Sequence, residues 1–162
     1  MKSKQIWAMV AALGLAGCNT GTTEEAVTEA PACIPGIEVT GGWMAMGAIP
    51  GDPAAVYFSI ANNDSTNHMI RAAAVDGAAS AMIHQMGTWS LQPSMDEVMQ
   101  LDIPAGETLV FEPGTYHVMA MEPGEQLAPG GQTHVTLTFV GGDTCTFPVE
   151  IHAAGDEPHH AE

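Results

Sequence analysis

Two histidines and two methionines have types and spacings suited to binding a soft metal ion. They are His84, Met95, His117 and Met119, with ten residues between the first two and twenty-one between Met95 and His117. Residues two apart in a β-strand project from the same face, so His117 and Met119 would point to one side. Copper favours imidazole and thioether ligands, and thioether sulfur selects Cu(I) over hard cations. The pattern therefore predicts a Cu(I) site.

Other methionines lie close enough to these residues to take part. Met86 and Met121 each follow a candidate ligand by two residues, so each would share that ligand's strand face. We interpret them as candidates for a secondary thioether shell. Met44 and Met46 form a further alternating pair, and for all four of these methionines packing and metal contact are open alternatives.

The charge balance of the chain excludes one large class of function. Nineteen residues are Asp or Glu and three are Lys or Arg, which gives a formal net charge of −16. Binding to nucleic-acid phosphates requires Lys and Arg, so no nucleic-acid partner is expected. The acidity keeps the protein in solution and favours cations and basic partner surfaces. No phosphate loop, nucleophile elbow or paired-carboxylate spacing is present, so no enzyme activity is predicted.

The N-terminus has the layout of a bacterial export signal. A short basic start precedes an apolar run from Ile6 to Leu15, which is too short to span a bilayer. The run ends in Leu-Ala-Gly-Cys18, which resembles the lipobox of lipoproteins. We therefore expect a signal peptide at 1–17, a lipid on Cys18, and a flexible tether at 18–32 that links the membrane to a periplasmic domain. An ordinary signal peptide is the alternative.

The remaining two cysteines admit two interpretations. With Cys18 lipidated, Cys33 and Cys145 are an even pair in an oxidising compartment and can form a disulfide. Alternatively, Cys145 is a copper thiolate, as in blue-copper electron-transfer proteins. Such sites add a Met shortly after the cysteine, and none follows here.

Short apolar or alternating runs separated by Gly and Pro turns predict an all-β domain at 33–152. Eight to nine short strands packed as a β-sandwich or barrel are expected. Met69 and Met82 are expected in its core, and the last two strands should form a hairpin around Gly141-Gly-Asp143. The expected strands are 37–46, 54–60, 69–75, 81–86, 99–103, 108–111, 116–121, 133–140 and 144–151.

The spacing of the four candidate ligands resembles the motif of the periplasmic copper chaperone family PCu(A)C. Trp43, Ile103-Pro-Ala-Gly106 and Pro113-Gly114 also look like that family, and the resemblance runs from about Glu38 to Ile151. It implies a cupredoxin-like β-barrel that binds one Cu(I) through the four matched residues. It also implies delivery of copper to cytochrome oxidase, with oxidase subunit II or a Sco-like thiol protein as the partner.

The segment 153–162 is an acidic tail with histidines. His159 and His160, with His152 before them, resemble the His-rich extensions of some family members, which implies a Cu(II) site; an acidic end without metal is the alternative. The function that the sequence favours is a lipid-anchored Cu(I) metallochaperone. An electron-transfer cupredoxin and a lipoprotein that binds only other proteins remain alternatives.

Overall fold

A computed structural model describes residues 31–156 and 158, and within these residues every regular element is a β-strand. No helix in this part of the chain is long and apolar enough to cross a bilayer. The expectations for the signal peptide, Cys18, most of the tether, His159 and His160 lie outside the described residues. The ten strands are β1 (Ile37–Ala45), β2 (Ala54–Asn62), β3 (His68–Val75), β4 (Ala78–Trp89), β5 (Gln92–Glu97), β6 (Leu101–Ile103), β7 (Thr108–Phe111), β8 (Tyr116–Pro123), β9 (Gln132–Phe139) and β10 (Thr144–His152).

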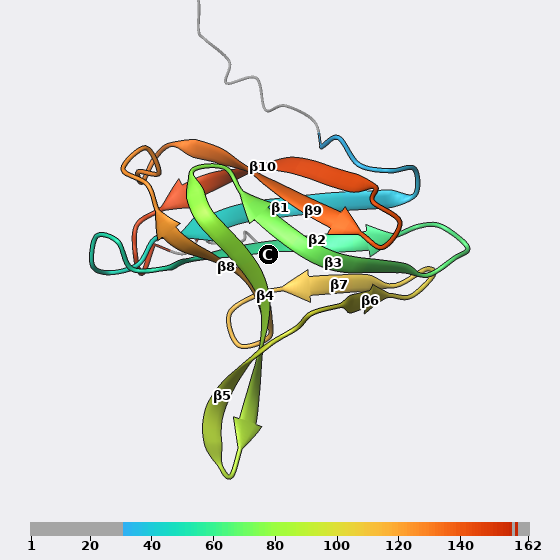
Figure 1. Cartoon of the computed structure of the whole chain (residues 1–162), viewed down its shortest axis with the longest axis horizontal. Helices are drawn as coiled ribbons and strands as arrows, with labels where there is room; N and C mark the ends of the chain where they lie inside the picture. Colours follow the sequence, from blue (N-terminus) through green and yellow to red (C-terminus); the bar gives the residue numbers. More distant parts are fainter. Residues whose placement is uncertain (1–30, 157, 159–162) are drawn as a thin grey trace, which may run out of the picture.

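All ten strands belong to one sheet that curls around a single core. Its order is β5-β4-β8-β2-β1-β10-β9-β3-β6, and β7 pairs with β2 beyond the end of β8. Strands β3 and β4 stand far apart in this order, yet a short turn joins them and they contact one another. The sheet therefore folds back on itself, and the β4–β5 hairpin extends away from the barrel (Figure 1).

Alternating burial along the strands explains why the chain forms this barrel. In β2, Val56, Phe58 and Ile60 are almost fully buried while the residues between them are partly exposed. Phe58 stacks on Phe111 at 4.2 Å between ring centroids and contacts Phe147 at 4.9 Å. Burying each such side chain contributes about 1.5–3 kcal/mol, so the alternation fixes which face of each strand turns inward.

A bulge in β1 moves Trp43 to the outer face of the sheet. The register with β2 shifts between Thr40 and Trp43, so the two glycines between them interrupt the alternation. Gly42 fits because a Cβ there would lie 2.9 Å from a Val149 methyl carbon. After the bulge, Met44 points into the core and is fully buried. Trp43 instead pairs with Tyr57 on the outer face, 4.6 Å away between ring centroids.

The observed architecture confirms the predicted all-β class and the hairpin formed by β9 and β10. Nine of the ten strands lie where the sequence predicts them; β5 was missed. Its residues are exposed or half-buried throughout, so they lack the alternation that marks a half-buried strand. A disulfide joins Cys33 to Cys145 and ties the start of the barrel to its last strand.

Candidate metal centre

Strands β4 and β8 bring the two histidines of the predicted site together. Their antiparallel register places His84 directly opposite His117. The two rings are perpendicular, with 5.5 Å between centroids and 87° between planes. Directly opposed residues project from the same face of a sheet, so both imidazoles lie on one side of the β4–β8 pair.

The two methionines lie on this same face, one on each side of the histidine pair along the strands. Met119 follows His117 by two residues and is opposite Met82 on β4. Met95 comes from β5 and is opposite Met86, which follows His84 by two residues. Alternate residues of a strand are about 6.8 Å apart between Cα atoms, a distance that a flexible thioether side chain can bridge. The register therefore collects all four donors on adjoining positions of β5, β4 and β8.

This face is the outer face of the sheet, yet part of it is shielded from water. Ile83 and Val118, which alternate with the histidines, point into the core. His117 is only 4% exposed and has the Tyr57 ring 6.2 Å away on its other side. Met95 is 48% exposed. The candidate site thus has a buried imidazole on β8 and an accessible thioether on β5.

The electrostatics of the two imidazoles suit a metal ion. Burial lowers the pKa of His117 below its usual value, and the nearby His84 lowers it further. His117 therefore remains neutral, as a ligand must be, to lower pH than an exposed histidine. Nδ1 of His84 is buried and has no hydrogen-bond partner, which is unfavourable unless another group contacts it. A bound cation would satisfy a nitrogen lone pair of this kind, so the donor set fits copper.

The secondary methionines fall into two groups. Met86 lies beside Met95, and Met121 lies opposite Ser80 on the same face as Met119. Met44 is in the core and Met46 packs against it, which favours packing for this pair.

The expectation for Met82 and Met69 was wrong, because neither belongs to the buried core. Met82 is half-buried and opposite Met119, so it is a thioether of the candidate site that the sequence analysis missed. Its spacing of two residues from His84 could have revealed it. Glu97, opposite His84, was also missed, because β5 was not predicted.

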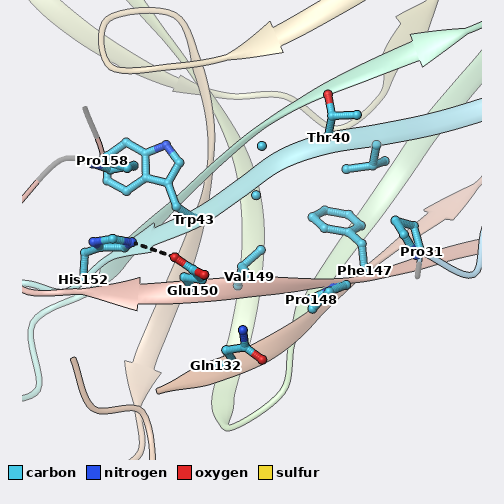
Figure 2. A pocket seen from close by; sticks show the side chains of 13 residues that line it. Pro31, Thr40, Trp43, Gln132, Phe147, Pro148, Val149, Glu150, His152 and Pro158 are labelled. Carbon is cyan, nitrogen blue, oxygen red and sulfur yellow. Dashed lines mark ion pairs between the residues drawn. The ribbon is translucent and has the colours of Figure 1, made fainter. Parts of the chain in front are cut away.

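An aromatic row continues from the histidines across the outer face of the sheet. In space, the Tyr57 ring lies next to His117 and the Trp43 ring lies next to Tyr57. His152 lies beyond Trp43, with 6.0 Å between the ring centroids. Beside Trp43 is a cavity of about 400 Å³, which the last described residue, Pro158, also lines (Figure 2). There Nε2 of His152 is 3.7 Å from a carboxylate oxygen of Glu150. This cavity includes none of the four candidate Cu(I) ligands.

Other metal chemistries lack the residues they need within the described part of the chain. No group of three or more His, Cys, Asp or Glu side chains comes together at residues 31–156 and 158 in a way that could hold a metal. Cys145 is bonded to Cys33, so it offers no thiolate for a blue-copper site. Among the described residues, the mixed imidazole and thioether set of β5, β4 and β8 is the arrangement whose chemistry suits copper.

Comparison with solved structures defines the class of fold. The copper-bound PCuAC domain of PmoF2 aligns with a TM-score of 0.63 at 14% identity, over 77% of this chain and 99% of that one. The apo PCuAC domain of PmoF1 gives 0.64 at 22% identity, over 76% and 98%. The Cu(I) form of DR1885 from Deinococcus radiodurans gives 0.54 at 25% identity, over 75% and 80%. The fold is that of PCuAC domains, as the resemblance implied.

The sequence itself places the chain in a family. Residues 37–151 match the family described as "Putative lipoprotein LpqE-like", and the chain belongs to it. It is also similar to "Putative lipoprotein Lxx21020" of Leifsonia xyli subsp. xyli, at 29% identity over 140 residues. That similarity covers 86% of this chain and 82% of the relative.

Proposed function

We propose that this protein is a Cu(I)-binding metallochaperone with no enzyme activity. His84, Met95, His117 and Met119 are its ligands, and copper is the cargo. The observation that carries the proposal is the register of β5, β4 and β8, which collects two imidazoles and two thioethers on one face. The likeness to copper-bound PCuAC domains supports it.

The donor set accounts for both capture and release of the ion. Thioethers are uncharged at any pH and polarizable, so they favour Cu(I) over Zn²⁺ and Mg²⁺. Neutral imidazoles add affinity, and the lowered pKa of His117 keeps that ring available for binding. The site contains no thiolate, since Cys33 and Cys145 are bonded to each other. An acceptor with one or two thiolates would bind Cu(I) more tightly, so the ion would move toward it.

The cellular setting follows from the lipobox and the family. In this proposal a lipid on Cys18 anchors the protein on the periplasmic side of a membrane, and residues 18–32 tether the domain at 33–152. The family description as a lipoprotein supports the anchor. The acceptor is a copper protein of the envelope, such as oxidase subunit II or a Sco-like protein, which would assign the protein to assembly of the oxidase copper centre.

Titration of the soluble domain with Cu(I) in the presence of a competing chelator tests the ligand assignment. Wild type should bind one ion tightly, and the variants His117→Ala/Met119→Ala and His84→Gln/Met95→Leu should lose at least tenfold in affinity. The second variant changes more exposed side chains, so it separates loss of a ligand from loss of the fold. The matched control, His68→Gln/Met69→Leu, removes one imidazole and one thioether from β3 and should bind as wild type does. Wild-type affinity in both ligand variants would reject the assignment.

We also propose a second copper site, for Cu(II), at the C-terminal tail. His152, His159 and His160 would bind Cu(II), with the Glu150 carboxylate close to His152. Support comes from Nε2 of His152, which is buried and has no hydrogen-bond partner. Electron paramagnetic resonance of the protein loaded with one equivalent of Cu(II) should show nitrogen ligation that is lost on deletion of residues 153–162. An unchanged spectrum would exclude the tail.

A further inference from the structure

The β4–β5 hairpin ends in two large apolar side chains that the fold does not use. Trp89 is 78% exposed and Leu91 is 91% exposed. Strand β4 pairs with β8 only as far as Gln85, so from Gly87 to Ser94 the two strands of the hairpin have only each other as neighbours. The hairpin extends from the barrel as a two-stranded ribbon (Figure 1).

The turn at the end of this ribbon keeps its apolar residue at a position that disfavours one. Ser90 and Leu91 form the two-residue loop, and their φ angles are +50° and +64°. Two-residue hairpin loops with positive φ favour Asn and Gly, because a Cβ atom clashes with the backbone there. Leucine is a costly choice for such a loop, which indicates that its side chain serves another purpose.

The hairpin also carries part of the candidate metal centre. Met95 on β5 is half-exposed and lies on the same face of the ribbon as His84 and Met86. Trp89 is an odd number of residues along β4 from His84 and Met86, so Trp89 lies on the opposite face. Leu91 lies at the tip between them. A partner that grips the ribbon in a groove would therefore contact all three side chains and cover the accessible edge of the copper site.

We propose that the hairpin is the docking element for the copper acceptor, a protein with an apolar groove edged by Lys and Arg. This inference rests on the proposed function for the identity of the partner. The charge of the hairpin specifies the chemistry of that edge, because Asp96 and Glu97 directly follow Met95 and neither strand of the hairpin contains Lys or Arg. Exposed aromatic and aliphatic anchors fill such grooves, while charges at the edge steer the encounter.

Two observations favour a protein partner over a lipid surface or a second copy of this chain. Anionic headgroups would repel the acidic hairpin, and two chains with a net charge of −16 each would repel one another. The described chain also begins on the side of the barrel away from the hairpin tip (Figure 1). An N-terminal anchor would thus leave the tip free to point away from the membrane.

The test uses the full-length protein in its native cells. Trp89 is replaced by the photoreactive residue p-benzoylphenylalanine. The same replacement at Val140, which is exposed in the turn after β9, is the control. A protein that cross-links only from position 89 is identified and purified. Its binding and its uptake of Cu(I) are then measured with wild type, with Trp89→Thr/Leu91→Asn, and with the control variant Ile49→Asn/Val140→Thr. Asparagine suits positive φ, so the turn should remain intact.

We expect the purified partner to take Cu(I) from wild type and from the control variant. Its affinity for Trp89→Thr/Leu91→Asn should be at least tenfold weaker, and its affinity for wild type should fall as salt rises. The proposal is overturned if position 89 cross-links to lipid or to a second copy of this chain, or gives no more cross-linking than position 140. It is also overturned if the cross-linked protein accepts no Cu(I), or if it binds wild type and Trp89→Thr/Leu91→Asn with equal affinity. Direct Cu(I) titration of each variant tests the metal site separately, because Trp89 and Leu91 are not ligands.

Discussion

His84 and His117 face one another across β4 and β8, with 5.5 Å between their ring centroids. The two residues are far apart in the sequence and are aligned only by strand register. A shift of one residue in that register would turn every β4 side chain to the opposite face. The buried residues that alternate with the histidines, Ile83 and Val118, prevent such a shift because it would expose them. The core of the barrel therefore fixes the geometry of the imidazole pair.

Proton competition at His117 should begin below the usual histidine range. Its pKa is lowered by burial and then by His84, so at pH 6.5, where an unperturbed histidine is about half protonated, fewer than half of the His117 rings are protonated. Cu(I) affinity should therefore hold from neutral pH to about 6.5 as far as His117 is concerned, and decline at lower pH. Chelator competition measured between pH 5 and 7.5 checks this. Affinity independent of pH over the whole range would mean that imidazoles do not ligate the ion.

The same pKa shift predicts how the stability of the metal-free domain depends on pH. The pKa of His117 is lower in the folded state than in the unfolded state, where it is about 6.5. Between these two values the unfolded state binds more protons, so the free energy of unfolding should decrease as pH falls below about 6.5. Urea unfolding of wild type and of His117→Gln at several pH values measures this contribution. A decrease of the same size in both proteins would assign it to other groups.

The two thioethers opposite one another on β4 and β5 should contribute unequally. Met95→Leu replaces a proposed ligand with a side chain of similar volume, and we expect it to weaken Cu(I) binding at least tenfold, or by about 1.4 kcal/mol. Met86→Leu, at the paired position, should weaken it less. In both variants the midpoint of urea unfolding should equal that of wild type within experimental error. Equal losses would assign Met86 to the ligand set, and a larger loss for Met86→Leu would reverse the assignment.

The bulge in β1 provides a test of how the outer face is organised. A Cβ on Gly42 would lie 2.9 Å from a Val149 methyl carbon and 3.0 Å from the Pro148 carbonyl oxygen. Because a backbone atom cannot move aside cheaply, Gly42→Ala should lower the free energy of unfolding by about 1–3 kcal/mol. It should also change the fluorescence of Trp43.

The control for this prediction is Gly87→Ala in the hairpin. There the nearest atoms are side-chain oxygens of Ser94 and Asp96, at 3.1 and 3.8 Å. These side chains are free to adjust, so the change should stay within about 0.5 kcal/mol. If Gly42→Ala is equally mild, β1 does not need the close approach to β10.

The sequence was sufficient to predict the class of fold and the shared strand face of His117 and Met119, for identifiable reasons. Strands such as β2 and β9 alternate strictly, and His117 and Met119 share a face in any strand. Strand β5 could not be predicted, because it is an exposed edge strand that contains Pro93 and follows a turn without Gly or Asn.

The sequence also could not predict which residues of neighbouring strands lie opposite one another. The opposition of Met82 to Met119 and of Met86 to Met95 depends on which strands are neighbours in the barrel. Trp43 reaches the outer face only because of the bulge at the two glycines before it. Both features result from tertiary packing, which no local pattern encodes.

X-ray absorption at the copper edge of the Cu(I)-loaded domain tests the central claim most directly. We expect a Cu(I) ion bound by both nitrogen and sulfur. The sulfur contribution should decrease in Met95→Leu and in Met119→Leu, and the nitrogen contribution should decrease in His84→Gln. A spectrum with nitrogen and oxygen ligands alone, or one that these three substitutions leave unchanged, would contradict it.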